Sequence, residues 1–169
     1  MNLFLVLLSG VCWSIVYIEL IRNGFKDKTY AMPLFALGLN FAWEVIYSVD
    51  SLVLNAASVQ GFVNLVWAIL DAVIVYTFFK YGCEYFPKKA EKYFIPFGIL
   101  AFITCFILQL AFYLHFESVP ASKYSAFAQN AAMSIMFLTM LFQRGNTRGQ
   151  TTLMAVAKCI GTLAPTILG

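Results

Sequence analysis

Charged side chains are scarce in this sequence. Asp, Glu, Lys and Arg make up only 11% of its 169 residues, whereas hydrophobic residues account for 62% and aromatic residues for 17%. The mean hydropathy is +0.81. A chain of this composition has too few polar side chains to cover a water-soluble globule. The sequence therefore predicts an all-α integral membrane protein in which residues 1–169 form a single transmembrane domain.

The motifs of several enzyme classes are also absent. There is no GxSxG, no HExxH, no Gly-rich phosphate loop and no Asp-rich motif of the kind that binds magnesium with a prenyl diphosphate. The single histidine, His115, cannot build a multi-His metal site, and the four cysteines show neither metal-ligand spacing nor a disulfide framework. These chemistries are therefore poorly supported by the sequence. The basic residues form no continuous patch, so we expect no nucleic-acid partner.

Apolar segments of membrane-spanning length recur along the chain. A spanning helix needs about 20 residues. Segments that approach or reach this length lie at residues 1–21, 31–49, 61–81, 93–116, 122–142 and 150–168. They predict a bundle of six transmembrane helices, with five or seven as the alternatives. Residues 1–21 lack the basic start of a secretory signal, so we interpret them as the first span. Residues 50–60 are expected to form a loop or a short amphipathic piece on the membrane surface.

The connections between these spans differ in charge. The first, third and fifth connections hold all Lys and Arg residues except Lys123 and Lys158. Basic residues favour the cytoplasmic side of a membrane. The sequence therefore predicts a multi-pass protein with both termini on the non-cytoplasmic side.

A few strongly polar side chains interrupt the apolar spans. They are Asn40, Glu44, Asn64, Asp71, Gln109, Gln129, Asn130 and Lys158. Such groups are costly in hydrocarbon and normally face the bundle interior. Asn40 and Glu44 are four residues apart and Asn64 and Asp71 are seven apart, so each pair shares a helix face. Helices that rise about 1.5 Å per residue in alternating directions would bring all of them except Asn64 to one polar layer, between the midplane and the non-cytoplasmic half.

Two interpretations of this layer remain open. Polar residues often join transmembrane helices, at about 0.6–2 kcal/mol per contact, and Lys158 could neutralise Glu44 or Asp71. The two acids favour a functional role, because amides could join helices without burying an ionisable group. Glu19 also lies in an apolar run, but it is near a span end, and we expect it to be a surface group that reaches Arg22.

Buried carboxyl groups have two well-known uses in membranes. A carboxyl group in an apolar cavity favours its protonated form because desolvation penalises the anion, so it can act as a general acid toward a poor base. Nearby aromatic faces would stabilise cationic charge on the substrate. Intramembrane carboxylates also carry protons in transporters, which makes a small proton-coupled transporter the alternative function. Neither a clear inverted repeat nor a Gly/Pro-broken helix pair supports transport. A non-catalytic membrane subunit is a third possibility.

Two short elements resemble a known family. An Asn-x-x-Trp-Glu element lies at Asn40, Trp43 and Glu44 within MPLFALGLNFAWEVIYS, and a Trp-x-x-x-Asp element lies at Trp67 and Asp71 within VNLVWAILDAVIVYTFFKYG. With the later RGNTRGQ and KCIGTLAPT segments, they resemble the small integral-membrane terpene cyclases of meroterpenoid and indole-terpenoid biosynthesis, which are known chiefly from fungi and have bacterial relatives. The resemblance extends from about residue 30 onward.

The resemblance implies a reaction. A terminal epoxide, or occasionally an olefin, on a prenylated aromatic or polyketide core is protonated, ring closures follow, and a deprotonation ends the cascade without a metal or organic cofactor. Glu44 matches the family's Trp-Glu acid. The family's second acid lies in a late helix of a longer, seven-helix chain, whereas the last span here offers Lys158 and no carboxylate. Asp71 is therefore nominated as the partner acid on its depth and helix face.

The expected site combines these inferences. Glu44 is expected to protonate the epoxide, and Asp71 to tune it or to relay the proton. Residues expected to contact the substrate are Asn40, Trp43, Asn64, Trp67, Gln109 and Asn130. The amides would orient the epoxide oxygen or a catalytic water, and the two tryptophans would line the path of the cation. The expected partners are a hydrophobic prenylated small molecule and the lipid bilayer.

Overall fold

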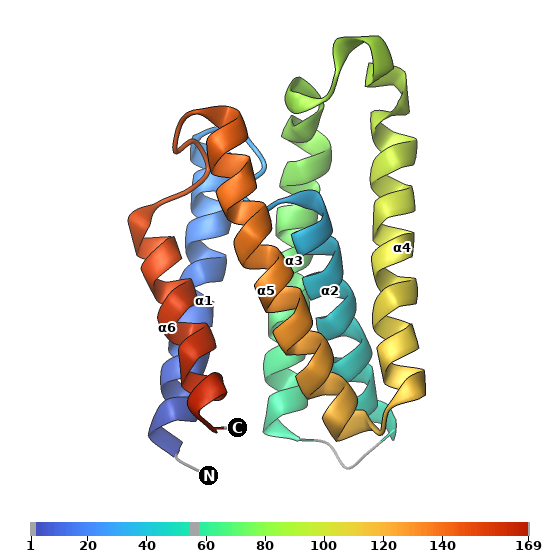
Figure 1. Cartoon of the computed structure of the whole chain (residues 1–169), viewed down its shortest axis with the longest axis vertical. Helices are drawn as coiled ribbons and strands as arrows, with labels where there is room; N and C mark the ends of the chain where they lie inside the picture. Colours follow the sequence, from blue (N-terminus) through green and yellow to red (C-terminus); the bar gives the residue numbers. More distant parts are fainter. Residues whose placement is uncertain (1–2, 55–57, 169) are drawn as a thin grey trace.

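The chain folds as a bundle of helices in the computed structural model, which describes residues 3–54 and 58–168 (Figure 1). The long helices are α1 (Leu3–Lys26), α2 (Leu34–Val49), α3 (Val59–Tyr81), α4 (Phe94–His115), α5 (Ser118–Arg144) and α6 (Thr152–Leu168). A π-helical turn, Asp50–Leu54, continues α2, and two 3₁₀ turns, Gly82–Tyr85 and Lys88–Tyr93, join α3 to α4. The prediction of an all-helical membrane bundle is confirmed.

Among the residues that the structure describes, five helical segments are long and apolar enough to cross a membrane. They are Leu3–Lys26, Leu34–Leu54, Val59–Tyr85, Lys88–His115 and Ser118–Arg144, and a shorter apolar helix follows at Thr152–Ile167. The six expected spans therefore correspond to the six long helices within a few residues, apart from residues 1 and 2, which lie outside the described part. The expectation of a loop or surface piece at 50–60 needs correction at both ends, because 50–54 extend α2 and Val59 already begins α3.

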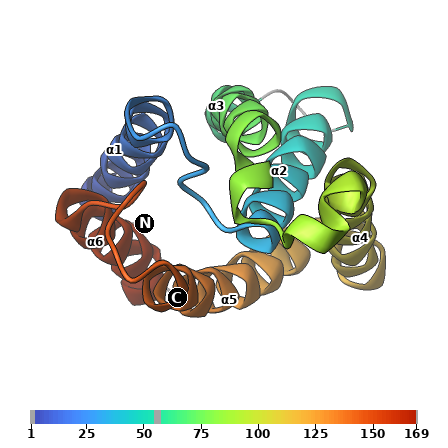
Figure 2. The same cartoon turned by 90° about the horizontal axis from the view of Figure 1, so that it is seen from above.

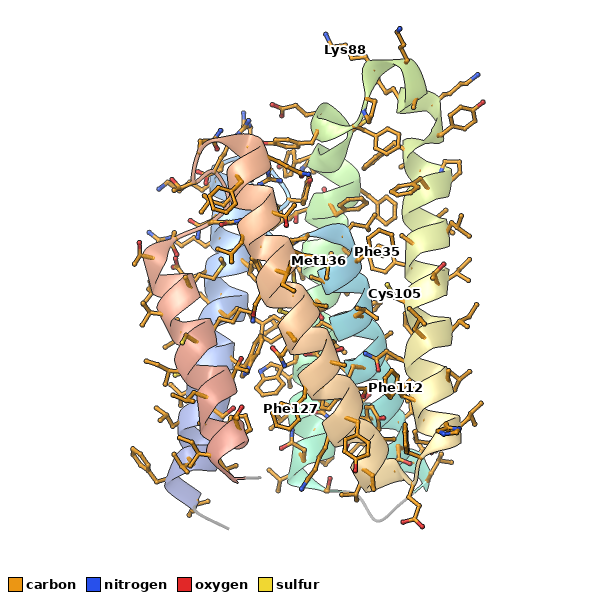
Figure 3. All side chains as sticks on the ribbon, in the orientation of Figure 1. Phe35, Lys88, Cys105, Phe112, Phe127 and Met136 are labelled. Carbon is orange, nitrogen blue, oxygen red and sulfur yellow. The ribbon has the colours of Figure 1, made fainter. Side chains whose placement is uncertain are left out.

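The outer faces of the bundle are apolar, as contact with lipid requires. Large hydrophobic side chains remain exposed along the helices, including Leu7, Leu100, Leu114 and Phe142, the last at 78%. Figure 3 shows side chains that project outward from the helices along the whole length of the bundle. In water this much exposed apolar surface would promote aggregation. A bilayer removes that cost, because lipid tails are as apolar as these side chains.

Helix α2 lies between α3, α4 and α5 and contacts all three, while α1 packs on α6 and on α3 (Figure 2). The buried core joins Leu20 of α1, Leu37 of α2, Ile74 of α3 and Met133 of α5. Both termini lie at one end of the bundle (Figure 1). The polar residues of α2 are thereby surrounded by other helices.

Small residues allow α4 to approach its neighbours closely. A Cβ atom added at Gly38 of α2 would lie 2.8 Å from Cys105 Sγ of α4, and one added at Gly98 of α4 would lie 2.8 Å from the Phe79 ring of α3. Close backbone approach at small residues is a general means of helix association in membranes. These contacts set how near α4 lies to α2 and α3.

The three connections at the end opposite the termini are fastened to one another. Arg148 Nη1 lies 3.0 Å from Glu84 Oε1, and Arg148 Nε donates to the Asp27 carbonyl at 3.0 Å. The guanidinium of Arg144 lies 4.3 Å from the ring centroids of both Tyr30 and Tyr85. The connection that follows α5 therefore holds the other two, which fixes the relative positions of α1, α3 and α5.

Candidate functional site

The two acids predicted from the sequence are both buried inside the bundle. Glu44 on α2 is 2% exposed and Asp71 on α3 is 0% exposed. The ion pairs of the described residues are Arg22 with Glu19 and Arg148 with Glu84, so no cation pairs with either buried acid in that part of the chain. The structure thus places two carboxyl groups together in an apolar interior without a counter-charge.

Asn40 joins the two acids. It lies one helical turn before Glu44, so both side chains point to the same face of α2. Its Nδ2 atom lies 3.0 Å from Glu44 Oε1 and 2.9 Å from Asp71 Oδ2. One amide nitrogen therefore bridges a carboxyl of α2 and a carboxyl of α3.

A chain of amides sets the orientation of Asn40. The Leu39 carbonyl can only accept a hydrogen bond, so the Gln109 atom that lies 3.2 Å from it is the donor Nε2. The same nitrogen donates to Gln129 Oε1 at 2.6 Å, which leaves Gln129 Nε2 to face Asn40 Oδ1 at 3.4 Å. Each amide therefore fixes the next, and the donor end of Asn40 is turned toward the acids.

Tyr17 of α1 completes this network, and the sequence did not single it out. Its hydroxyl donates a hydrogen bond to Glu44 Oε1 and accepts one from Asn40 Nδ2 at 2.7 Å. Its ring stacks on Trp67 of α3, with centroids 5.9 Å apart and planes inclined by 26°. A tyrosine in an apolar span is indistinguishable by sequence from a packing residue, and only its position in the bundle identifies it.

Two members of the expected polar layer lie elsewhere. Lys158 Nζ donates to Ser134 Oγ at 2.9 Å and lies 5.8 Å from the centre of a Trp13 ring. Asn130 Nδ2 donates to the Ala126 carbonyl of its own helix at 3.0 Å. Both belong to the contacts of α5 and α6 with each other and with α1, so the expected single layer is divided into two groups.

Other predicted site residues are also outside the network. Asn64 is buried, but its Oδ1 atom accepts a bond from Gln60 Nε2 at 2.8 Å, near the start of α3. Trp43 Nε1 donates to the Ser122 carbonyl of α5 at 3.0 Å, which places the indole between α2 and α5. Of the eight predicted side chains, those brought together are Glu44, Asp71, Asn40, Gln109 and, through the ring of Tyr17, Trp67.

Two further carboxyl groups differ from expectation. Glu19 does pair with Arg22 at 3.3 Å, but it is only 6% exposed because Thr151 and Asn23 also contact it, so the expectation of a surface group was wrong. Asp50, which the sequence placed in a loop, is buried in the π-helical turn. Its two carboxyl oxygens accept bonds from the hydroxyls of Tyr113 and Ser118, each at 2.7 Å.

The acid pair retains unused hydrogen-bonding capacity. Glu44 Oε2 and Asp71 Oδ1 are buried and have no hydrogen-bond partner within the described residues. A buried oxygen without a partner is uncommon in folded proteins. Such an oxygen is available to a ligand. Within the same residues, no three His, Cys, Asp or Glu side chains gather where they could hold a metal ion.

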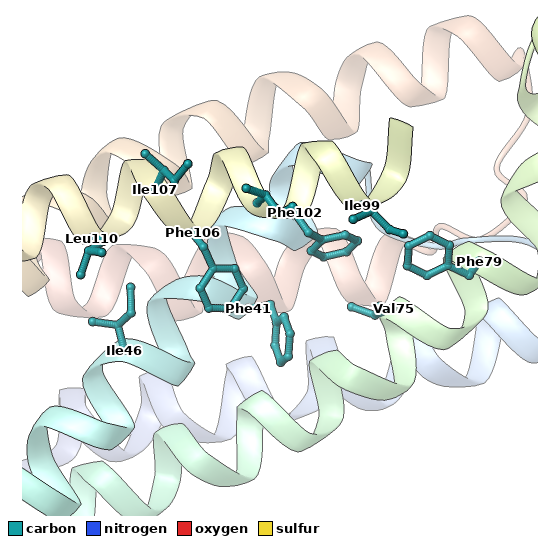
Figure 4. Close-up of a pocket in the computed structure, with 10 residues that line it drawn as sticks. Phe41, Ile46, Val75, Phe79, Ile99, Phe102, Phe106, Ile107 and Leu110 are labelled. Atoms are coloured by element: carbon teal, nitrogen blue, oxygen red, sulfur yellow. The ribbon is translucent and has the colours of Figure 1, made fainter. Parts of the chain in front are cut away.

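An apolar cavity of about 540 Å³ lies between α2, α3 and α4 (Figure 4). Its lining residues are Phe41, Ile46, Val75, Phe79, Ile99, Phe102, Ile103, Phe106, Ile107 and Leu110. A second cavity of about 420 Å³ lies near the fastened connections, beside Tyr30 and Phe86. Neither cavity is lined by Glu44 or Asp71, but Phe41 directly follows Asn40 and Val75 lies one turn after Asp71. Two lining residues of the first cavity therefore come from the helical turns that carry Asn40 and Asp71.

The chain is similar to fungal terpene cyclases. It is 31% identical over 164 residues to the Pyr4-family terpene cyclase mfmH of Annulohypoxylon moriforme. That match covers 94% of this chain and 66% of the relative. The chain is 30% identical to terpene cyclase pyr4 of Aspergillus fumigatus and 28% identical to terpene cyclase macJ of Penicillium terrestre. These matches cover 93% of this chain in both cases, and 65% and 62% of the relatives. The chain thus spans slightly less than two thirds of their length.

No solved structure is similar to the chain at a significant level. The family model described as Pyr4-like transmembrane terpene cyclases matches residues 1–168. That match covers every helix of the bundle and both acids. The chain therefore belongs to the Pyr4-like transmembrane terpene cyclases.

Proposed function

We propose that the protein is a membrane-bound terpenoid cyclase in which Glu44 protonates a terminal epoxide, or an olefin, of a prenylated aromatic or polyketide substrate. The observation that carries this proposal is the pair of buried acids, Glu44 and Asp71, bridged by Asn40 without a cation. The family membership supports cyclisation as the kind of reaction.

An acid catalyst must hold its proton until the substrate arrives. Two carboxylates buried side by side would repel each other and lose their hydration, so such a pair retains a proton. Lys158 would oppose this if it reached Glu44 or Asp71, but its ammonium is bound to Ser134 instead. The arrangement therefore favours proton donation over a buried ion pair.

The reaction balances without a co-reactant. The Glu44 proton passes to the epoxide oxygen, and the bond from that oxygen to the more substituted carbon breaks with its electron pair going to oxygen. The π electrons of the neighbouring double bond close a ring and move the cation along the chain. The proton lost from the last cation returns to the pair of carboxyl groups and restores the acid, so the product is an isomer of the substrate. Asp71, which lies within hydrogen-bonding reach of Glu44, tunes Glu44 or passes the proton to it directly.

The apolar cavity suits the rest of the substrate. Its volume of about 540 Å³ lies within the range of about 300–1,000 Å³ that is usual for small-molecule sites. Phe41, Phe79, Phe102 and Phe106 supply aromatic rings that would stabilise a migrating cation. We propose that the isoprenoid chain lies here, with its reactive end toward Asn40 and the acids. Trp67, which was expected to line the path of the cation, is not among the residues of this cavity, because its ring stacks on Tyr17 instead.

The decisive experiment uses cells that express the chain and are fed phenols or polyketides with epoxidised prenyl chains. Wild type should convert one of them to a product of unchanged mass and new retention time, whereas transport would only move the compound. Glu44→Gln should leave the protein inserted in the membrane and abolish that product. Glu19→Gln, which alters another buried carboxyl whose partners are Arg22, Asn23 and Thr151, is the matched control and should remain active. Normal product from Glu44→Gln would remove Glu44 from the mechanism.

The membrane orientation is part of the proposal. The connections that carry most of the Lys and Arg residues all lie at the end opposite the termini (Figure 1). The positive-inside bias then directs that end to the cytoplasm and both termini to the other side. Reporter fusions at the C-terminus and in the 145–150 connection should give opposite signals, and equal signals would contradict this orientation.

A further inference from the structure

Tyr17 occupies the position from which Glu44 can be controlled. It is 2% exposed and comes from α1, a different helix from either acid. Stacking on Trp67 fixes the plane of its ring and therefore the position of its hydroxyl oxygen. In that position the hydroxyl donates a hydrogen bond to Glu44 Oε1.

The hydrogen atoms of the network can be assigned by counting donors. Asn40 Nδ2 carries two hydrogens but faces three acceptors, of which the Tyr17 oxygen at 2.7 Å and Asp71 Oδ2 at 2.9 Å are the nearest. When the Tyr17 oxygen and Asp71 Oδ2 receive the two amide hydrogens, the Tyr17 oxygen acts as an acceptor toward Asn40. The Tyr17 hydroxyl hydrogen is then free to point at Glu44 Oε1. The chain of amides that begins at the Leu39 carbonyl keeps Asn40 in this orientation. If any of these amides were reversed, a donor would face a donor, or an acceptor an acceptor.

The same count locates the proton of Glu44. A neutral carboxyl group has one oxygen that only accepts and one that carries the proton. Glu44 and Asp71 lie within hydrogen-bonding reach of each other. Oε1 accepts the bond from Tyr17, so the proton belongs on Oε2, which receives no hydrogen bond from a donor in the described part of the chain. That oxygen is therefore the one that can donate to a ligand.

We propose that Tyr17 is a positioning residue that directs the acidic proton of Glu44 to Oε2 and stabilises the carboxylate left after proton transfer. In the step, the bond between Oε2 and hydrogen breaks, a bond between hydrogen and the epoxide oxygen forms, and Glu44 keeps the electron pair. The hydrogen bond from Tyr17 then has a charged acceptor, and such bonds are about twice as strong as neutral ones. Because this gain develops with the reaction, it lowers the barrier and leaves substrate binding unchanged. This inference rests on the proposed function.

The test is Tyr17→Phe, which keeps the ring on Trp67 and removes only the hydroxyl. With membranes and the epoxide that the feeding experiment selects as substrate, kcat should fall about tenfold to a hundredfold while KM stays within about twofold. The matched control is Tyr113→Phe, which removes a hydroxyl bound to Asp50, a buried acid outside the network, and should leave kcat unchanged. An unchanged kcat in Tyr17→Phe would overturn the inference, as would a loss confined to KM.

A second series keeps the inference testable if Tyr17→Phe does not fold. Replacement of Tyr17 by 3-fluorotyrosine and 3,5-difluorotyrosine preserves the shape and makes the phenol a stronger donor. If Tyr17 stabilises the Glu44 carboxylate, kcat should rise with fluorination at constant KM and constant thermal stability. A kcat that does not respond would contradict the role. The outcomes also separate the two proposals, because active Glu44→Gln would refute the cyclase mechanism, whereas inactive Glu44→Gln with fully active Tyr17→Phe would refute only the role of Tyr17.

Discussion

Asn40 Nδ2 lies 2.9 Å from Asp71 Oδ2, and this contact joins α2 to α3 within the interior of the bundle. The same nitrogen also reaches Tyr17 and Glu44, so one amide serves three helices. Its loss would leave two buried acids with fewer donors. The stability of the bundle and the protonation of the site therefore depend on the same residue.

Asn40→Ala should be strongly destabilising. It removes the donor shared by Glu44 and Asp71, and buried acceptors without a partner are costly, so we expect a loss of about 2–4 kcal/mol in the free energy of unfolding. Thermal unfolding in detergent micelles measures it. The control is Asn130→Ala, whose amide bonds mainly to its own helix backbone and which should cost less than about 1 kcal/mol. Equal losses in both variants would argue against the bridging role.

Lys158→Met should keep cyclase activity within about twofold of wild type. The ammonium contacts Ser134 and lies over Trp13, and it forms no ion pair with Glu44 or Asp71. Replacing a partly buried charge by an apolar side chain of similar length is often neutral for stability. Product formation and melting temperature in the same membranes check both points. A large fall in product with normal stability would show that Lys158 acts on the site.

The buried carboxyl at Asp50 should be energetically coupled to Tyr113. The Tyr113 hydroxyl donates to Asp50 Oδ1 at 2.7 Å, which ties α4 to the turn after α2. Hydrogen bonds to charged groups contribute about 1.5–3 kcal/mol. In a double-mutant cycle of Asp50→Asn and Tyr113→Phe, unfolding free energies should deviate from additivity by about 1 kcal/mol. Strict additivity would mean that this contact does not stabilise the bundle.

The close approach of α2 and α4 should be sensitive to a single methyl group. In Gly38→Ala the new Cβ would lie 2.8 Å from Cys105 Sγ, so we expect a loss of about 1–3 kcal/mol. Adding Cys105→Ala removes the sulfur and should recover part of that loss. Gly10→Ala is the control, because nothing lies within 4 Å of its added Cβ, and it should be neutral or slightly stabilising. Thermal unfolding of wild type, Gly38→Ala, the double variant with Cys105→Ala, and Gly10→Ala would show whether the second substitution restores stability.

The sequence alone determined the setting and the helices. Apolar runs long enough to cross a bilayer leave little choice but a helical bundle, because a backbone in lipid must satisfy its own hydrogen bonds. The acids Glu44 and Asp71 and the amides beside them stood out because polar groups are costly in those runs. Spacing along one helix also placed Asn40 and Glu44 on one face, as the structure has them.

Only the tertiary structure decided which of these side chains meet. Depth along a helix is readable from sequence, but the rotation of one helix against another depends on packing between residues far apart in the chain. That packing turned Lys158 and Asn130 toward the interface of α5 with α6. It also brought Tyr17 into contact with Glu44, which lies 27 residues further along the chain. From the sequence, Tyr17 could not be distinguished from an ordinary packing residue. The polar residues in apolar spans could therefore be identified from the sequence, but their hydrogen-bond partners depended on how the helices pack against one another.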